Sequence, residues 1–305
     1  MSAIQINKVF KTFPGVQALK GVDLTIRQGE FFGLLGPNGA GKSTLINIIA
    51  GLTHADSGEV AVMGSDVRQD YRNARKRIGV VPQELVFDPF FTVREVLRIQ
   101  AGYFGLGKEC HDWLEELMAA LKLSDKADTN MRALSGGMKR RVLVGQALVH
   151  KPDVVILDEP TAGVDVELRQ SLWQFVERLH KEGHTIVLTT HYLEEAESLC
   201  DRIAILNHGE IVALDNKDAL MAKGIGRRLR LAVTVAERLP QVPESLVGKL
   251  LRHEDNSLVL ELDRDQDSVV GVIDTLRAAG AHVTDLHTEQ ADLEDIFVDL
   301  VRDRE

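Results

Sequence analysis

Short apolar runs alternate with helical patterns over the first two thirds of the chain. Residues 154–157 and 185–189 are apolar and rich in β-branched side chains, as expected of parallel strands that are covered on both faces. Between them, residues 166–182 place apolar side chains at every third or fourth position, which predicts a helix. These side chains are Leu168, Leu172, Phe175, Val176 and Leu179. A strand, a crossover helix and a second strand form the parallel unit of an α/β domain.

This pattern is interrupted near residue 221, where two glycines and three basic residues occur close together. We therefore place a domain boundary there, with an α/β domain over residues 1–223 and a small α+β domain over residues 224–305. The smaller domain is predicted to contain strands over residues 229–235, 257–262 and 282–286, a helix over residues 268–279 and a final helix from Asp292.

Composition and charge narrow the class of protein. The chain has 305 residues and 44% hydrophobic composition, which suffices for a buried core. Its 46 acidic and 36 basic residues give a net charge of -10, which argues against a nonspecific nucleic-acid binder. We expect no nucleic-acid partner.

Targeting signals and cysteine chemistry are not evident. Cys110 and Cys200 match neither a disulfide framework nor a zinc-ligand spacing, so a reducing cytosol is the simplest location. The N-terminus lacks the apolar core of a signal peptide, and no apolar run approaches the roughly 20 residues that span a bilayer. Any role at a membrane would then require a partner.

A glycine-rich loop follows the apolar strand predicted over residues 31–35. It reads Gly36, Pro37, Asn38, Gly39, Ala40, Gly41, Lys42, Ser43 and Thr44, and a helical pattern follows it. This is a phosphate-binding loop in the strand-loop-helix setting that it requires. Backbone N–H groups turn toward one anion, Lys42 neutralises the outer phosphates, and the Ser43 hydroxyl holds Mg²⁺. The alternative, a flexible glycine turn, does not account for the flanking strand and helix.

Two carboxylates, Asp158 and Glu159, stand at the end of the strand predicted over residues 154–157. Ligand sites in open α/β sheets lie at the carboxyl ends of the strands. We expect Asp158 to act on Mg²⁺ through water and Glu159 to polarise the water that attacks the γ-phosphate. A solvated acidic strand end is the alternative, and the phosphate-binding loop favours the catalytic interpretation.

The tetrapeptide Leu134-Ser135-Gly136-Gly137 precedes a further predicted helix. It resembles the signature of the ATP-binding cassettes. Ser135 and the N–H groups of this helix start form a second γ-phosphate receptor, which in that family serves the ATP bound by the other subunit. Alone, the tetrapeptide would be interpreted as a glycine helix cap; its order and spacing with the other motifs favour the family resemblance.

The resemblance covers one complete cassette, from residue 3 to about residue 222. It implies a P-loop NTPase fold with a parallel sheet core, an antiparallel β portion and a helical subdomain around residues 92–149. It also assigns Gln83 to the ATP and Mg²⁺ site, Asp165 to the ATP site and His191 to a contact with the γ-phosphate. Taken by itself, His191 would more often be structural.

The family further implies a homodimer in which ATP binds between Lys42 of one subunit and Ser135 of the other. Phe13 stands where the family commonly places an aromatic residue that stacks on adenine; burial as an ordinary apolar side chain is the alternative. Lys139 to Arg141 follow the signature near a helix start, which disfavours cations. They are interpreted either as a solvated face or as neighbours of ATP.

Three aromatic side chains, Phe87, Phe90 and Phe91, crowd into the segment that couples cassettes to membrane subunits in this family. An exposed cluster would anchor an interface, although a buried core explains the pattern as well. Thr92 and Glu95 then predict a capping box for the next helix.

Within the family, residues 190–197 and 292–298 resemble the ATPases of the ABC-2 type, which export drugs and polysaccharides. This implies an ATPase at the cytoplasmic face of the membrane that drives a separate permease. One alternative is a soluble cassette protein that acts on ribosomes or DNA, but those relatives usually carry two cassettes or a long coiled coil. Another is a nucleotide sensor without turnover, against which Lys42 and Glu159 together argue.

Overall fold

The computed structural model describes residues 1–162, 166–225, 228–237, 242–263, 266–289, 293–294 and 296–297. It divides into two compact units, Met1–Asp215 and Asn216–Glu305. The boundary expected after residue 223 falls inside helix α8 (Lys217–Ile225), which belongs as a whole to the second unit.

The first unit is built on a six-stranded sheet with the order β10-β9-β3-β8-β7-β6. Its strands are β3 (Phe31–Leu35), β6 (Ile78–Val81), β7 (Val154–Asp158), β8 (Thr185–Thr189), β9 (Arg202–Asn207) and β10 (Glu210–Asn216). The pairs β6–β7, β7–β8, β3–β8 and β3–β9 are parallel. Every residue of β3, β7 and β8 is buried, and α6 (Val166–Lys181) is the predicted crossover helix. The predicted parallel unit is confirmed.

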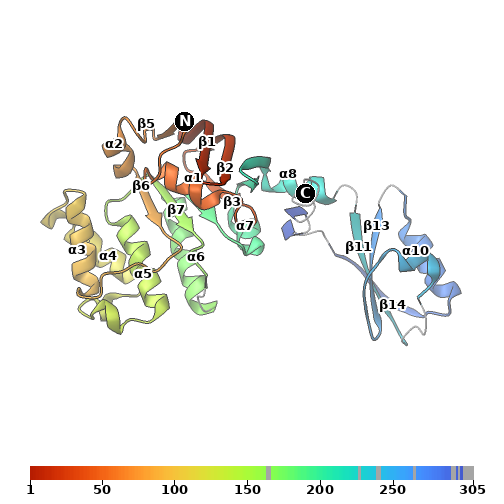
Figure 1. Cartoon of the computed structure of the whole chain (residues 1–305). Helices are drawn as coiled ribbons and strands as arrows, with labels where there is room; N and C mark the ends of the chain where they lie inside the picture. The colour runs from red at the N-terminus through yellow and green to blue at the C-terminus, as the bar shows by residue number, and fades with distance from the viewer. Residues whose placement is uncertain are drawn as a thin grey trace. The chain divides into compact units, whose positions relative to one another are not determined.

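An antiparallel sheet with the order β2-β1-β4-β5 accompanies the parallel sheet. Its strands are β1 (Ser2–Phe13), β2 (Val16–Arg27), β4 (Ser57–Val62) and β5 (Ser65–Asp66). Helix α1 (Lys42–Ile49), coloured orange in Figure 1, shares one hydrophobic core with both sheets. Ile4 from β1, Leu45 from α1 and Ile156 from β7 are all buried in that core. The position of α1 is therefore fixed by packing on both sides.

The predicted helical subdomain consists of α3 (Val93–Tyr103), α4 (His111–Ala120) and α5 (Gly136–Leu148), which lie together in Figure 1. The predicted capping box at the start of α3 is confirmed, because Thr92 and Glu95 exchange both hydrogen bonds. Two shorter helices, α2 (Tyr71–Lys76) and α7 (Leu193–Leu199), complete the unit with 3₁₀ turns over Lys108–Cys110, Ser124–Lys126 and Met131–Ala133.

The second unit contains an antiparallel sheet with the order β12-β13-β11-β14. Its further elements are β11 (Arg228–Val235), α9 (Glu244–Val247), β12 (Leu250–Glu254), β13 (Ser257–Asp263), α10 (Val269–Ala278) and β14 (Val283–Glu289). Alternate residues of β11 and β13, with Val272 and Leu276 of α10, form its core. The three predicted strands and α10 are present, whereas α9 and β12 were not predicted.

The helix predicted from Asp292 falls largely outside the described residues; its described positions, 293–294 and 296–297, are helical. Among the helices of the described residues, none combines the length and the apolar composition that a membrane span requires.

Candidate functional site

A pocket with a volume of about 500 Å³ lies at the N-terminal end of α1. It is lined by Phe13, Val16, Ala18, Asn38, Gly39, Ala40, Gly41, Lys42, Ser43, Thr44, Gln83 and Glu159. These residues come from β1, β2, the glycine-rich loop and the segments that follow β6 and β7. The fold thus brings together residues that the sequence assigned to one site from four parts of the chain.

The glycine-rich loop adopts backbone conformations that favour glycine. Gly39 has φ +80 and Gly41 has φ +107, and a Cβ at Gly41 would lie 2.5 Å from the carbonyl oxygen of Ala18. Gly41 is the N-cap of α1 and has no side chain with which to cap it. The first N–H groups of α1 are consequently left without a side-chain cap at the positive end of the helix, an arrangement that binds anions.

Lys42, in the first turn of α1, is only 9% exposed. Its Nζ donates hydrogen bonds to the carbonyl oxygens of Gly36 (2.6 Å) and Pro37 (3.1 Å). Burial lowers the pKa of Lys42, and the charges of Glu159 and Asp158 counteract part of that shift. The ammonium group is therefore held in place by the backbone of the loop, inside a site that also contains carboxylates.

Asp158 is the last residue of β7, and its carboxylate is buried. The Thr189 hydroxyl donates to Asp158 Oδ1 over 2.5 Å. Burial raises the pKa of Asp158. Glu159 follows with φ +47, a conformation that is strained for a side chain of this type, and its N–H donates to the Thr189 carbonyl oxygen over 3.0 Å. The Asp158 carboxylate and the Glu159 backbone are thus anchored to the end of β8.

Two side chains from neighbouring strand ends reach the Glu159 carboxylate. Gln83, beyond β6, donates from Nε2 to Glu159 Oε2 over 2.8 Å. His191, beyond β8, has Nδ1 3.5 Å from the same oxygen. Because β6, β7 and β8 are adjacent and parallel, their carboxyl ends bring these residues to one edge of the sheet.

Phe13, at the end of β1, is exposed and lines the pocket. Lys11 Nζ lies 5.2 Å from the centre of its ring. The alternative interpretation of Phe13, an ordinary buried side chain, is therefore wrong.

The signature residues lie apart from this pocket. Ser135 is the N-cap of α5 and accepts a hydrogen bond from the N–H of Met138 over 3.3 Å. Ser135 and Gly136 are exposed and Gly137 is half-buried, and none of the three is among the residues that line the pocket. Asp165 lies outside the described residues.

Of the three basic residues after the signature, Arg140 is buried, whereas Lys139 and Arg141 are half-buried. Arg140 is only 5% exposed, so the interpretation as a solvated face is wrong for this residue. Its guanidinium donates to the carbonyl oxygens of Pro82 (2.5 Å) and Gln83 (2.7 Å). Burial lowers the pKa of Arg140, while Asp158 and Glu159 act in the opposite direction. The apolar environment that makes this cation unfavourable is thus offset by nearby carboxylates and by backbone carbonyls.

A buried carboxylate that sequence analysis missed, Glu195 of α7, connects three parts of the unit. The hydroxyls of Thr161 and Thr190 each donate to it over 2.8 Å, and Trp173 Nε1 donates over 3.2 Å. Thr161 follows Glu159 closely and Thr190 precedes His191, so Glu195 supports both segments. No local pattern distinguishes it from the exposed Glu194 beside it.

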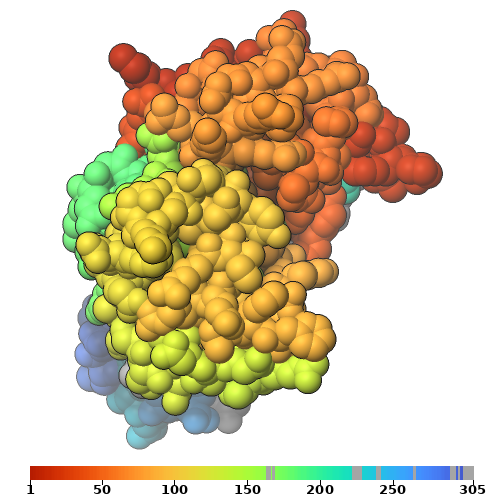
Figure 2. Space-filling model, turned by 90° about the vertical axis from the view of Figure 1, so that its left-hand side faces the viewer, coloured from red at the N-terminus to blue at the C-terminus, as the bar shows by residue number. Residues whose placement is uncertain are grey.

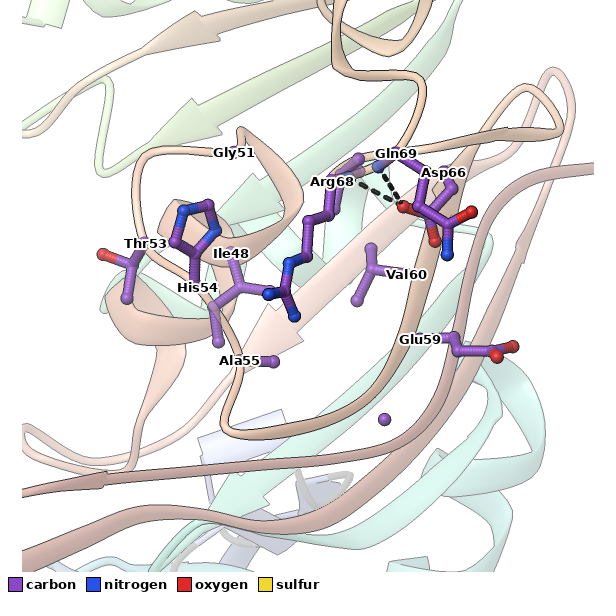
Figure 3. A pocket seen from close by; sticks show the side chains of 12 residues that line it. Ile48, Gly51, Thr53, His54, Ala55, Glu59, Val60, Asp66, Arg68 and Gln69 are labelled. Carbon is purple, nitrogen blue, oxygen red and sulfur yellow. Dashed lines mark hydrogen bonds between the residues drawn. The ribbon is translucent and has the colours of Figure 1, made fainter.

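A second pocket lies at the opposite, C-terminal end of α1. Its volume is about 220 Å³, and its lining includes Ile48 and Thr53. Figure 3 shows the side chain of Arg68 extending into it. The Asp66 carboxylate accepts the N–H groups of Arg68 (2.8 Å) and Gln69 (2.7 Å), which fixes the turn that carries this arginine. Sequence analysis did not predict this pocket.

Comparison with known sequences identifies relatives of the first unit and of the whole chain. The family model described as ABC transporter matches residues 19–162. The Nod factor export ATP-binding protein I of Burkholderia lata is 43% identical over 74% of this chain and 75% of its own length. The linearmycin resistance ATP-binding protein of Bacillus subtilis is 35% identical over 97% of both chains.

Solved structures agree with these relatives. A structure of an ATP-binding subunit of an ABC transporter has a TM-score of 0.69 and 27% identity over 73% of this chain and 93% of that one. A dimeric ATP-binding cassette in a post-hydrolysis state, bound to ADP and Pi, has a TM-score of 0.65 and 28% identity over 70% of this chain and 98% of that one.

Proposed function

The chain belongs to the ABC transporter family and is an ATPase of that family, and from this premise we propose that it powers export through a separate membrane permease. Support comes from relatives whose names place them in Nod factor export and linearmycin resistance. The transported substrate of this chain is not assigned by either name.

ATP is proposed to bind in the pocket at the start of α1. The uncapped N–H groups of α1 and the buried ammonium of Lys42 would contact its phosphates. Phe13, exposed on the pocket wall, would stack on the adenine ring. The single observation that carries this proposal is the buried Lys42, held by two loop carbonyls at the uncapped helix end.

Mg²⁺ would be held by Ser43 and Gln83, with Asp158 acting through water. In the described part of the chain no group of three or more His, Cys, Asp or Glu residues could hold a metal ion. This fits Mg²⁺, which is usually bound by one or two protein ligands together with phosphate oxygens and water.

For hydrolysis, Glu159 would polarise the attacking water as the general base. Gln83 and His191 already contact the Glu159 carboxylate, and so would orient it and contact the γ-phosphate region. Lys42 would stabilise the negative charge on the outer phosphates during transfer. The strained backbone of Glu159 supports a placement chosen for chemistry rather than for stability.

The active form is proposed to be a two-fold homodimer in which each ATP lies between Lys42 of one subunit and Ser135 of the other. Ser135, Gly136 and Gly137 are absent from the lining of the pocket in their own chain, and the N–H groups at the start of α5 would receive the γ-phosphate of the partner's ATP. Asp165 is proposed to complete that interface. The similar cassette that is dimeric with ADP and Pi bound supports a dimer.

The permease is proposed to dock on the segment between Gln83 and α3. Leu85, Val86, Phe90 and Phe91 are exposed there, and Phe90 is 74% exposed. Figure 2 shows this light-orange segment on the surface beside the yellow helices of the helical subdomain. Exposed aromatic side chains are frequent anchors of interfaces. Docking there would place the chain at the cytoplasmic face of the membrane.

The decisive experiment replaces Glu159 with Gln in the full chain. Gln keeps the shape and can contact the same neighbours, but it cannot take up a proton. Turnover should fall by roughly 10²- to 10⁴-fold, the range for loss of a positioned base. ATP binding should persist because Lys42 and the loop are unchanged, so an ATP-bound dimer should accumulate in sizing chromatography with ATP and Mg²⁺.

The matched control is Glu194→Gln, which makes the same chemical change at an exposed position of α7 and should leave turnover within about twofold. A Glu159→Gln chain that hydrolyses ATP at the parental rate would contradict the catalytic role. One that stays monomeric at saturating ATP would contradict the shared site.

A further inference from the structure

Helix α5 has an exposed N-terminus and a buried arginine that contacts the segment after β6. At its N-terminus, Ser135 and Gly136 are exposed. One and a half turns later, the buried Arg140 reaches the segment after β6 and donates to two consecutive carbonyls, those of Pro82 and Gln83. A single rigid helix therefore joins an exposed phosphate-receptor motif to the loop of its own ATP pocket.

The contact continues from that loop to the catalytic carboxylate. While its carbonyl accepts from Arg140, Gln83 donates from its side chain to Glu159 Oε2 over 2.8 Å. Arg140, Gln83 and Glu159 thus form an unbroken chain of hydrogen bonds from α5 to the proposed base. A displacement of α5 would move the Gln83 backbone and change how its amide contacts Glu159.

A second contact between the same segments strengthens this link. The ammonium of Lys139 lies 4.3 Å from the centre of the Phe87 ring, so two successive residues of α5 hold the segment after β6. Helix α5 also packs on β6 itself. The helix and the segment are consequently expected to move together rather than slide past one another.

We propose that Arg140 is a positioning residue that couples the two ATP sites of the dimer. Engagement of Ser135 with the ATP of the partner subunit shifts α5, and Arg140 transmits that shift through Gln83 to Glu159 in its own site. This proposal rests on the shared-site dimer proposed above, and extends it by assigning the connection between the two sites to one side chain.

The chemistry requires arginine at this position. The planar guanidinium presents several donors in a fixed fork, which suits two carbonyls at once, whereas the lysine ammonium is a point charge on a flexible stem. Arg140→Lys therefore keeps the positive charge near Asp158 and Glu159 but loses the two-point hold. This separates an effect of charge from an effect of position.

Arg141 provides a matched control on the same helix. Its guanidinium also donates to two carbonyls, those of Leu121 and Lys122, each over 3.3 Å. These carbonyls belong to the helical subdomain rather than to the loop of the ATP pocket. Arg141→Lys weakens an analogous contact and leaves the hydrogen bonds from Arg140 through Gln83 to Glu159 unchanged.

The test measures ATPase rate against ATP concentration for the full-length parent chain, Arg140→Lys, Arg140→Met and Arg141→Lys. The parent and Arg141→Lys should have a Hill coefficient above 1, limited by the two sites of the dimer. In Arg140→Lys, coupling between the sites should weaken by about 5-fold or more, so its Hill coefficient should approach 1. ATP affinity of the monomer should stay within about twofold, because Arg140 does not line the pocket.

Several results would overturn the proposal: a parent chain that hydrolyses ATP with a Hill coefficient of 1, an Arg140→Lys chain that keeps the parental Hill coefficient, or equal loss of cooperativity in Arg141→Lys. Each of these leaves the ATPase activity and the proposed ATP pocket intact, because they fail only if the parent chain does not hydrolyse or bind ATP. If Arg140→Met unfolds, the Arg140→Lys result decides.

Discussion

The two ends of helix α1 each border a pocket, but the chain treats them differently. At the C-terminal end, Gly51 has φ +68, and the N–H groups of Leu52 and Gly51 donate to the carbonyls of Asn47 (2.8 Å) and Ile48 (3.0 Å). These two bonds form a Schellman motif. The Arg75 guanidinium donates to the Gly51 carbonyl over 2.8 Å, which places a cation at the negative end of the helix dipole.

The N-terminal end of α1 lacks comparable capping interactions. Gly41 provides no side-chain cap, and the first turn contains no acidic residue. Lys42 places a buried cation at the positive end of the dipole, where it is unfavourable. One helix thus has an end that the protein stabilises itself and an end that an anion must stabilise. The proposed ATP site therefore coincides with the end of α1 that is left without a side-chain cap.

The largest expected effect is that of Lys42→Ala. Loss of charged hydrogen bonds to the outer phosphates, worth about 3 kcal/mol, should raise the Kd for ATP by about 100-fold. The control at the satisfied end is Arg75→Ala, which should leave the Kd within about twofold. Titration calorimetry with ATP and Mg²⁺ measures both. Equal affinities in the Lys42→Ala and parent chains would remove the distinction between the two ends.

The two glycines that flank α1, Gly41 and Gly51, differ in how much space a Cβ would have. An alanine Cβ at Gly41 would meet the Ala18 carbonyl oxygen at 2.5 Å, whereas the nearest atom at Gly51 would be 3.5 Å away on Arg75. Gly41→Ala should therefore destabilise the chain by about 3 kcal/mol and distort the phosphate loop. Gly51→Ala should lose only about 1 kcal/mol, from its left-handed backbone.

Urea denaturation gives the two stabilities, and ATP titration at a temperature where both variants remain folded gives the affinities. We expect weaker ATP binding in Gly41→Ala alone. If Gly51→Ala weakened ATP binding as much, the two ends of α1 would be energetically coupled and the contrast between them would be lost.

Much of the first unit could be predicted from sequence because its signals are local. The loop from Gly36 to Thr44 combines a required backbone with a required cation, and the buried strands before Asp158 and His191 are continuous apolar runs. Since parallel strands end at one edge, the meeting of Glu159 and His191 follows from the strand assignments, whereas Gln83 was placed beside them by the family resemblance.

The remainder depended on contacts that no local pattern encodes. Arg140 is held by the carbonyl of Gln83, which lies 57 positions earlier in the chain, so no local pattern indicates that Arg140 is buried. Glu195 likewise accepts hydrogen bonds from Thr161 and Thr190, which are distant or irregularly placed in the sequence. In the second unit, β12 has a mixed sequence, Leu-Leu-Arg-His-Glu, without clean alternation. Its strand conformation comes from pairing with β13, in a ladder that contains an irregularity.

Asp158→Asn tests whether the buried carboxylate at the end of β7, near Lys42 at the start of α1, lowers the stability of the ligand-free chain. Burial raises the pKa of Asp158 above its ordinary value of 3.8, so the native state favours the protonated form more than the unfolded state does. Stability should then fall as the pH rises from 3.8 through the raised pKa, and the loss persists at neutral pH. The Asn variant should have the higher Tm at pH 7.

This advantage of Asp158→Asn should shrink at about pH 3, below the ordinary pKa of 3.8, where the parent carboxyl is largely protonated in both states. Adding ATP and Mg²⁺ should stabilise the parent more than the variant, because Asp158 is proposed to act on the metal ion. Thermal denaturation at both pH values, with and without nucleotide, provides the measurement. A variant with a lower Tm at pH 7 would show that this carboxylate stabilises the free protein.

The smallest expected change in stability concerns the C-terminal end of α1. Arg75→Ala removes one exposed hydrogen bond to the Gly51 carbonyl, so it should lower the free energy of unfolding by about 1 kcal/mol and Tm by about 2–4 °C. The control is Arg68→Ala in the adjacent pocket, where the backbone N–H rather than the guanidinium contacts Asp66; this change should stay within about 0.5 kcal/mol. Because the contact acts on a helix dipole, the Arg75 effect should decline at high salt. A loss that is equal for both variants, or independent of salt, would mean that the C-terminal end of α1 is held by packing alone.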